Sequence, residues 1–382
     1  MPFQVSVQFD TNSNEATFFE SIPPKPAVFA IFSKEAKGPE APPYLSRTSD
    51  LRRRLTRLLG KPASSSRRLN LREVAGRFEY SRVGSGFEAR WLLYLMNKSY
   101  YPKLYRQRLR LKPPALLKLN LSNRFPRLFP TRRMARDNAI YYGPFRSRVE
   151  AERWSAEFLD FFKIRRCVED LTPDPAHPGC IYSQMHMCLA PCFAGCTDEE
   201  YASEVSRVVA FLDAGGQSLV RALEGERTQA ADSLEFEQAA KIHRRLEKVH
   251  EVLRQKPDLV RNLREFHGVV VERGAEPNSV AFFRVCAGEL RGPATLCLDE
   301  NVSSPVSLDE QLHNLLDSLA AENGSADRSA KPAAPPWEHL SLLARWYYSS
   351  FRRGELVMLP ASQQIPHARL IRICRKLLAA ES

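Results

Sequence analysis

Five cysteines lie close together in the middle of the chain. Four of them follow the spacing C-x12-C-x7-C-x3-C, and a fifth comes four residues after the last. The segment also holds four prolines, which favour turns over helix or strand. Thiol-rich loops with few apolar residues are commonly held together by a metal or by disulfides. The spaced cysteines are Cys167, Cys180, Cys188 and Cys192, and the fifth is Cys196.

Metal binding is favoured over disulfides because nothing near the start of the chain resembles a secretory signal. Residues 1–30 lack a basic start, an apolar run and a small-residue cleavage site. No apolar run is long enough to span a membrane. We therefore expect a cytoplasmic protein without membrane contact, in which thiols stay reduced. Four thiolates suit tetrahedral zinc or an iron–sulfur cluster, and the spacing does not choose between them.

The cysteine segment carries a family resemblance. The run CIYSQMHMCLAPCFAGCTDEEY at 180–201 resembles part of UvrC, the third subunit of the bacterial excinuclease of nucleotide-excision repair. YYGPFRS at 141–147 resembles the YFGPY stretch that precedes these cysteines in the family. The resemblance implies a [4Fe–4S] cluster on the four spaced cysteines, with zinc as the alternative. Cys196 lies outside the family pattern.

The first third of the chain alternates short strands and helices. AVFAIF from Ala27 predicts a strand, and PYLSRT predicts a second one after a turn. DLRRRLTRLL predicts a helix with one leucine face, capped by Thr48 or Ser49. EARWLLYLMNKSYY predicts another helix, which stops before Pro102. Over residues 25–110 this order resembles the GIY-YIG nuclease domain with which UvrC begins.

That resemblance implies a nuclease site of which some residues are retained. The second family tyrosine is kept as Tyr44. The basic residue three positions later is Arg47, and the family arginine falls on Arg54. These three residues are the candidate catalytic set, which we expect to be an inactive remnant.

Other positions of the family site are changed. The first tyrosine falls on Phe29, the family glycine on Ser46 and the asparagine on Tyr105. The metal-binding glutamate falls on Leu93, which offers no oxygen to Mg²⁺ or Mn²⁺. We predict that the fold is kept and that cleavage is impaired or lost. Glu79 is the alternative ligand, and Mg²⁺ or Mn²⁺ would be needed only if cleavage survives.

Basic residues predict a polyanionic partner. The formal net charge is +12, and residues 106–136 contain ten Lys or Arg and no acid. A solvated surface would mix charges, so the run favours contact with DNA phosphates, as in damaged duplex. The candidate DNA-binding residues are Arg52, Arg53, Arg106, Arg108, Arg110, Arg132 and Arg133.

Two amphipathic helices follow the cysteines. Apolar residues recur at helical spacing before and after the junction LEFE, residues 234–237. The pair resembles the UVR motif, a helical hairpin through which UvrC docks on UvrB. A small hairpin buries little on its own, so a UvrB-like partner is expected, although packing within the chain is the plainer alternative. The predicted partner-binding residues are Leu234, Phe236, Glu237 and Ala240.

From His267 the pattern alternates as in paired strands, and residues 322–336 read as a flexible linker. A helix, a strand and a basic terminal helix follow. In UvrC the corresponding stretch introduces the RNase H-like nuclease domain. We expect its catalytic part to be missing here.

Together these observations predict an α+β multidomain protein with a small GIY-YIG-like α/β domain, a Cys-rich module, a UVR helical hairpin and a C-terminal α/β segment. The expected divisions are a loose tail at 1–22, the GIY-YIG-like domain at 23–110, the basic and Cys-rich region at 111–200, a helical region at 201–256 with the UVR motif at about 217–253, and the α/β segment at 257–382.

The predicted function is that of a UvrC-like nucleotide-excision-repair protein that binds DNA and UvrB, with impaired or lost incision. One alternative is an active single-site structure-specific endonuclease. Another is a cluster-dependent DNA-binding regulator. The chain has no P-loop and no Rossmann glycine fingerprint, so use of ATP is not expected.

Overall fold

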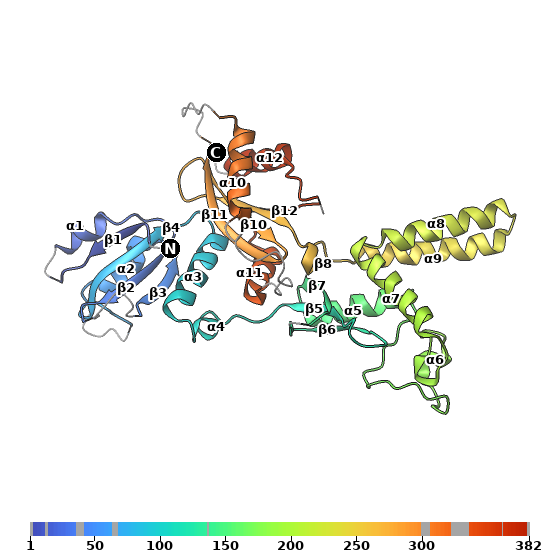
Figure 1. Cartoon of the computed structure of the whole chain (residues 1–382). Helices are drawn as coiled ribbons and strands as arrows, with labels where there is room; N and C mark the ends of the chain where they lie inside the picture. Colours follow the sequence, from blue (N-terminus) through green and yellow to red (C-terminus); the bar gives the residue numbers. More distant parts are fainter. Residues whose placement is uncertain are drawn as a thin grey trace.

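The computed structural model describes residues 3–11, 14–35, 42–62, 68–135, 137–298, 306–321, 336–360 and 362–379. Within these ranges the chain forms three four-stranded antiparallel sheets, each with helices packed on it (Figure 1). The predicted α+β multidomain class is confirmed at this level. No helix in the described ranges is both long and apolar enough to span a lipid bilayer.

The first sheet has the strand order β1-β4-β2-β3. Its elements are β1 (Val5–Gln8), α1 (Glu15–Glu20), β2 (Ala27–Ser33), β3 (Tyr44–Thr48), α2 (Leu51–Leu59), β4 (Ala75–Arg82) and α3 (Gly86–Tyr100). Alternate residues of a strand face opposite sides of the sheet, so α2 and α3 pack on apolar residues of opposite faces. Phe29 and Phe78 pack with the leucines of α2, whereas Ala30 and Phe32 pack with Met96 of α3.

Two local predictions about this domain were wrong. The expected loose tail contains β1, which pairs with β4, and it buries Phe9, Phe19 and Ile22 against the first sheet. The helix α2 is capped by Asp50, whose carboxylate accepts the N–H of Arg53 at 2.9 Å, and not by Thr48 or Ser49. The tail was expected to be loose because most of its residues are polar, but its few apolar residues are spaced so that they pack against the first sheet.

The second sheet belongs to the middle of the chain and has the order β6-β5-β7-β8. Its elements are β5 (Ala115–Leu119), β6 (Leu128–Thr131), β7 (Ile140–Phe145), α5 (Arg148–Leu159), α6 (Ile181–Gln184), the 3-10 turn Pro191–Phe193, α7 (Asp198–Asp213) and β8 (Arg261–Asn262). A single apolar cluster runs from Ala115 to Val260 and includes both α5 and α7. The stretches 111–200 and 201–256, expected as separate regions, therefore share one core.

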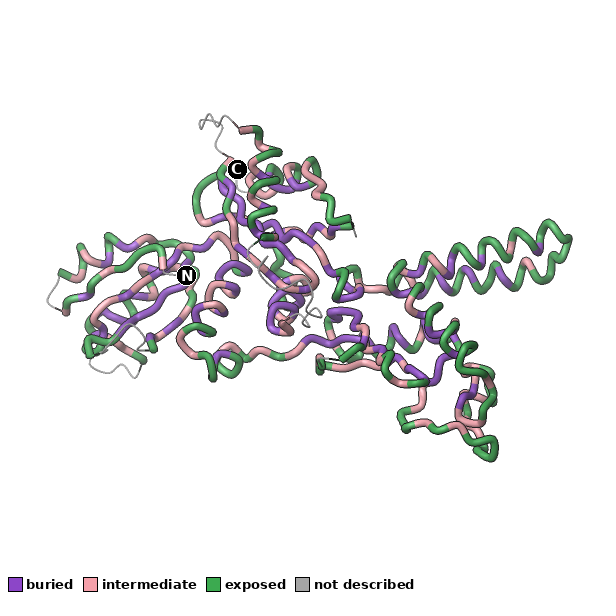
Figure 2. The backbone as a smooth tube through the Cα atoms, in the orientation of Figure 1, coloured by how far each residue is buried: buried purple, intermediate pink, exposed green. Residues whose placement is uncertain are grey.

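A helical hairpin leaves this core and projects from the body (Figure 1). It consists of α8 (Gln217–Asp232) and α9 (Phe236–Arg254), close to the predicted limits. Leu219 and Leu223 of α8 are buried with Ile242, Leu246 and Val249 of α9. Figure 2 shows the outer surface of both helices largely exposed. The hairpin thus buries its own apolar stripe, as the plainer alternative predicted, without excluding a partner elsewhere on it.

The third sheet has the order β11-β10-β9-β12. Its elements are β9 (Gly268–Arg273), β10 (Ser279–Cys286), β11 (Glu289–Cys297), α10 (Leu308–Ala321), α11 (Trp337–Tyr347), β12 (Glu355–Met358) and α12 (His367–Ala379). The helices α10 and α12 cover one face, while α11 packs on the other together with α3. Most of the predicted linker at 322–336 falls outside the described residues.

The first domain is docked on the third sheet through α3. The ring centroids of Phe87 and Phe283 lie 4.8 Å apart, and the Trp91 indole donates a 2.6 Å hydrogen bond to the carbonyl of Gly292. The backbone at Gly84 approaches Gly274 so closely that a Cβ at Gly84 would lie 2.1 Å from the Gly274 carbonyl carbon. The domains are therefore joined by packed core as well as by the chain.

We predict that Gly84→Ala weakens this docking, because the added methyl group has no space between the two backbones. The free energy of unfolding should fall by about 1–3 kcal/mol, as is typical of overpacked sites. Gly86→Ala is the matched control, since a Cβ there meets nothing within 4 Å. Urea unfolding of both variants is the measurement. Equal stability of the two variants would contradict the close approach at Gly84.

Candidate functional site

The four spaced cysteines lie in the long loop between α5 and α7. Burial raises the pKa of the Cys188 thiol to about 11, and the neighbouring thiols of Cys167, Cys180 and Cys192 push the pKa in the same direction. The N–H of Ala190 donates to Cys188 Sγ at 3.3 Å. The thiols of Cys167, Cys180 and Cys192 are therefore near enough to Cys188 to influence its charge.

The backbone of this loop bends tightly around the cysteines. His186, Ala190 and Ala194 have positive φ values of 55°, 55° and 58°. Left-handed conformations are unfavourable for residues with a Cβ and persist where surrounding structure imposes them. The imposed turns fix the directions in which Cys188 and Cys192 extend their thiols.

A buried arginine ties the loop to the middle domain. Arg165 is 2% exposed, and its Nε donates to the carbonyl of Phe125 at 2.8 Å. Its backbone N–H donates to the Tyr201 hydroxyl at 2.9 Å, and its guanidinium reaches Cys167 Sγ at 3.6 Å. The cysteine loop is thus held by α7 and by the second sheet at the same time.

The cysteine loop offers sulfur donors to a metal. Within the described residues, which include all eight cysteines, no three His, Cys, Asp or Glu side chains are close enough together to hold one ion. Four neighbouring thiols with N–H donors aimed at two of the sulfurs are nevertheless a soft donor set. Cys196 packs against the apolar core, and burial raises the pKa of its thiol.

In the first domain, the structure brings two of the three candidate catalytic residues together. The guanidinium of Arg54 donates to the Tyr44 hydroxyl at 3.0 Å, and Phe29 is fully buried beside Tyr44. Arg47 is exposed and lies near α3, where its charge adds to burial and lowers the pKa of Arg90. Tyr44 and Arg54 form a pair, while Arg47 stands apart from them.

Leu93, where the resemblance predicts a metal-binding glutamate, packs against apolar side chains. The two nearby carboxylates, Glu79 and Glu88, already have partners within the chain. Leu93 is half-buried against the apolar cluster between the sheet and α3. Glu79 forms a 3.1 Å ion pair with Arg77. Glu88 accepts the N–H of Gly84 at 2.8 Å, and burial raises the pKa of its carboxyl to about 7. Glu79 therefore has a partner on β4, and Glu88 has one in the turn between β4 and α3.

Several arginines predicted to contact DNA have structural partners instead. Arg52 donates to the carbonyls of Ile22 and Glu20 at 2.7 and 2.8 Å. Arg106 forms a 2.7 Å ion pair with the buried Glu338 of α11. Arg108 donates to Asn97 Oδ1 at 3.0 Å. The short helix α4 (Tyr105–Arg108) is thus fastened to α3 and α11.

The prediction of a basic run without acidic counterweight needs correction. Lys118 pairs with Asp137, and Arg124 pairs with Asp198 at 2.8 Å. These acids, like Glu338, follow the run in sequence and are brought into contact with its cations when the chain folds. Parts of the basic run are therefore neutralised by ion pairs. Among the described residues, the cations without an ion-pair partner lie in the remaining parts of the run.

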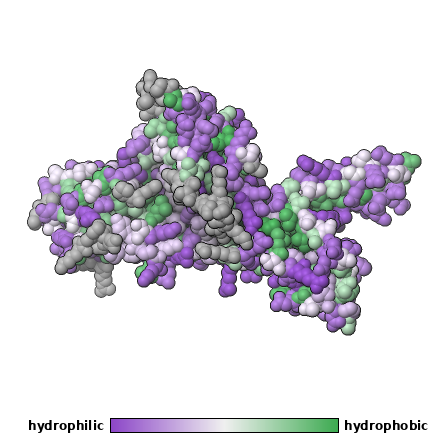
Figure 3. All heavy atoms as spheres, viewed as in Figure 1, coloured by the Kyte–Doolittle hydropathy of each residue, from purple (hydrophilic) through white to green (hydrophobic). Residues whose placement is uncertain are grey.

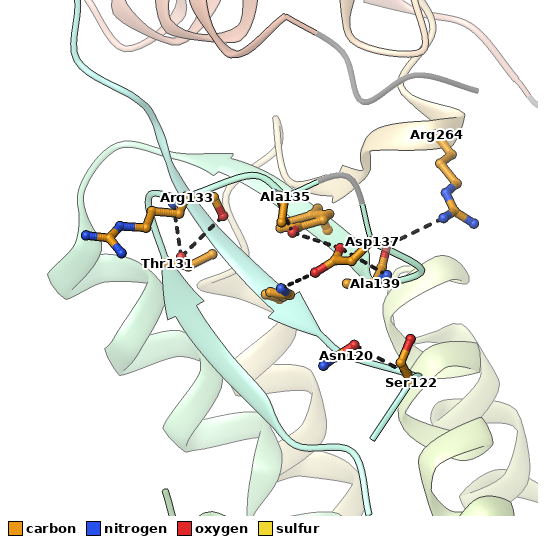
Figure 4. A network of polar contacts seen from close by, with 10 residues as sticks. Asn120, Ser122, Thr131, Arg133, Ala135, Asp137, Ala139 and Arg264 are labelled. Atoms are coloured by element: carbon orange, nitrogen blue, oxygen red, sulfur yellow. Dashed lines mark hydrogen bonds and ion pairs between the residues drawn. The ribbon is translucent and has the colours of Figure 1, made fainter. Parts of the chain in front are cut away.

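A polar network shapes the loop after β6 (Figure 4). The hydroxyl of Tyr141 donates to Asp137 at 3.2 Å and accepts the N–H of Ala135 at 3.0 Å. The N–H of Arg133 donates to the Thr131 hydroxyl at 3.0 Å, and the Arg133 side chain points away from the network. The network fixes the backbone that carries Arg132 and Arg133, both exposed.

The hairpin tip presents the predicted partner-binding residues. Leu234 has a positive φ of 61°, and the side chains of Leu234 and Phe236 are 72% and 67% exposed. Glu237 and Ala240 are also exposed. Figure 3 shows a small hydrophobic patch at this tip between mostly hydrophilic sides. The tight turn therefore directs apolar side chains into water.

Some notable side chains gave no signal in the sequence. Arg345 lies in an apolar helix, and Glu272 lies in the strand β9. Glu272 accepts a hydrogen bond from the Trp346 indole, and burial raises the pKa of its carboxyl.

Comparison with known proteins assigns the middle of the chain to a family. Residues 115–211 match the middle domain of UvrC/Cho excinucleases, and residues 217–252 match the UvrB/UvrC motif. These two segments are therefore similar to parts of UvrC proteins. The resemblance is thereby confirmed for the middle of the chain and for the hairpin.

The most similar curated relatives carry the name UvrABC system protein C. The protein from Methanothermobacter thermautotrophicus is 27% identical over 65% of this chain and 42% of its own length. The one from Carboxydothermus hydrogenoformans is 32% identical over 44% of this chain and 27% of its own length. The one from Syntrophomonas wolfei is 28% identical over 61% of this chain and 38% of its own length. The chain thus spans less than half the length of these relatives, and no solved structure matches it.

Proposed function

We propose that this chain is a UvrC-like protein of nucleotide-excision repair that binds DNA and docks on UvrB through the α8–α9 hairpin. The observation that carries the proposal is the exposed pair Leu234 and Phe236 at the tip of a matched UVR motif. The hairpin has already buried its apolar stripe, so the tip is its main remaining apolar surface. Exposed aromatic anchors of this kind supply much of the energy of protein–protein contacts.

Phe236→Ala tests the docking. Loss of an anchor at the centre of an interface typically costs about 2 kcal/mol or more, so the affinity for UvrB should fall about 30-fold or more. Calorimetric titration with purified UvrB is the measurement. Arg221→Ala on α8 is the matched control, because this side chain is also exposed and lies away from the tip.

A native chain that does not bind UvrB would overturn the proposed partner. Native binding that Phe236→Ala leaves unchanged would show instead that UvrB contacts another surface.

We further propose that Cys167, Cys180, Cys188 and Cys192 hold a [4Fe–4S] cluster rather than zinc. A zinc ion gathers its ligands around one centre, whereas each thiolate of a cubane binds a different iron. The UvrC-like spacing of the four cysteines supports the cubane. When bound, the cluster would join loop segments that have little apolar core of their own.

Cys188→Ser should abolish iron binding because Cys188 is the most enclosed of the four thiols and interacts with the other three. Iron and sulfide analysis of anaerobically purified protein, with its visible absorption, is the measurement. Cys196→Ser is the matched control and should keep the iron, since Cys196 packs on the apolar core. Stoichiometric zinc in the native protein would contradict the cluster.

Incision by the first domain is proposed to be impaired or lost. Leu93 supplies no oxygen ligand, and both Glu79 and Glu88 are engaged in other contacts. The retained Tyr44–Arg54 hydrogen bond favours the second candidate function, an active single-site endonuclease. In that case another carboxylate would have to bind the Mg²⁺ or Mn²⁺ ion.

We expect no nicking of a single-lesion duplex by the purified chain with UvrA, UvrB, ATP and Mg²⁺ or Mn²⁺. The reason is the missing metal ligand at Leu93. One cut near the lesion, abolished by Tyr44→Phe and Arg54→Ala but not by Arg57→Ala, would establish the endonuclease instead. Arg57 is an exposed arginine of the same helix and serves as the control.

A further inference from the structure

A groove of about 300 Å³ lies where the second sheet meets α11. Its walls come from the extended segment 110–115, from the ends of β6 and β7, and from one side of α11. Segments more than 190 residues apart in sequence thus face each other across it. The cations that line it are Arg110, Lys112, Arg132, Arg146 and Arg345.

The charge of this groove is of one sign. All five cationic side chains are exposed, no carboxylate lines the groove, and none of the five has an ion-pair partner among the described residues. The nearby Glu150 accepts the backbone N–H of Arg146 at 2.9 Å. The groove contrasts with Arg106, Lys118 and Arg124, which are paired with acids.

The walls of the groove are held in place by contacts that do not use the cations. The Ser341 hydroxyl donates to the carbonyl of Lys112 at 2.7 Å, and the Tyr348 hydroxyl donates to the carbonyl of Pro144 at 2.9 Å. Both bonds join α11 or its end to the middle of the chain. The cations are therefore carried on a fixed frame, which lowers the entropic cost of binding an anion.

The positive field extends from the groove towards the first domain. Arg345 lies near Arg90 of α3, and Arg90 lies near Arg47 of β3, since both charges help burial to lower the pKa of Arg90. Arg47 and Arg90 therefore add positive charge in the neighbourhood of Arg345, where Glu272 supplies a negative charge. Several cations spread over a surface suit an extended polyanion better than a single small ion.

The shape and composition of the groove select among polyanions. Four of its five cations are arginines, whose forked guanidinium groups match phosphate oxygens. A groove of about 300 Å³ lined by five cations and no carboxylate matches the repeated negative charges of a sugar–phosphate chain. A flat bilayer surface does not reach the floor of a concave site between two domains.

We propose that this groove, lined by Arg110, Lys112, Arg132, Arg146 and Arg345, binds the phosphodiester backbone of DNA and holds it between the middle domain and α11. The inference rests on the proposed DNA-binding function and gives it a location. Only Arg110 and Arg132 belong to the set predicted from sequence. Lys112, Arg146 and Arg345 are added by the fold.

The test is a salt titration of DNA binding by the triple variant Arg110→Ala, Arg132→Ala, Arg345→Ala. Each lost phosphate contact should reduce the slope of log K against log salt by about 0.9, so the slope should fall by about 2–3. The affinity for a fluorescent duplex should drop at least about tenfold at moderate salt. Fluorescence anisotropy is the measurement.

The control variant removes the same charge from the hairpin, with Arg221→Ala, Arg227→Ala and Arg244→Ala. It should keep the native salt slope, because these side chains lie on α8 and α9, away from the groove. A second groove variant, Arg132→Glu with Arg146→Glu, shows whether loss of binding in the first variant comes from misfolding. Both variants should have the same melting temperature as the native protein.

Each outcome has a separate meaning. Native DNA binding that both groove variants preserve would overturn the groove while leaving the proposed function intact. Equal losses of DNA affinity in the groove and hairpin variants would mean that the loss depends only on net charge. This result would also overturn the groove as the binding site. A native chain that binds no DNA at low salt would overturn the proposed DNA-binding function itself.

Discussion

The packing of α3 between two sheets is the contact on which the arrangement of the molecule depends. One side of the helix covers the first sheet through Met96, and the other places Phe87 and Trp91 against the third sheet. Full burial of a large apolar side chain contributes about 1.5–3 kcal/mol, so these two rings account for a substantial part of the docking. A helix with two buried sides has little freedom to rotate, and it fixes the orientation of the first domain.

The same apolar cluster draws in the middle domain. Leu116 and Tyr141 of the second sheet belong to it, together with Leu340 and Trp346 of α11. At its edge, Glu338 accepts hydrogen bonds from Tyr105 and Arg106, and these contacts lower the pKa of its carboxyl despite burial. The junction therefore uses some arginines as structural ties and leaves others at the groove. Where each arginine falls is a property of the junction and not of its local sequence.

The sequence allowed the helices, the hairpin and the cysteine loop to be predicted because their signals are local. The apolar periods on both sides of LEFE place the hairpin turn within a residue or two, and Pro102 marks the end of α3. Burial of Phe9, Phe19 and Ile22 was missed, since this segment packs through the pairing of β1 with β4, about 70 residues away.

The candidate site was predicted in the same uneven way. The four spaced cysteines and the hairpin tip were singled out from local sequence together with the family resemblance. The partners of Arg106 and Arg124 lie over 200 and over 70 residues away, so no local pattern could reveal that these arginines are paired. Arg345 was missed for the same reason, because only tertiary contact brings it beside Arg110 and Arg132.

The base of the hairpin has a consequence for how the chain can vary. A Cβ at Gly216 would meet the Leu253 side chain at 2.2 Å, so the residue that precedes α8 and the last turn of α9 are in contact. Immediately afterwards β8 returns to pair with β7. The chain therefore leaves and re-enters the middle sheet at nearly one point. Adding or removing matched turns from α8 and α9 would change the reach of the tip while the sheet below kept its register.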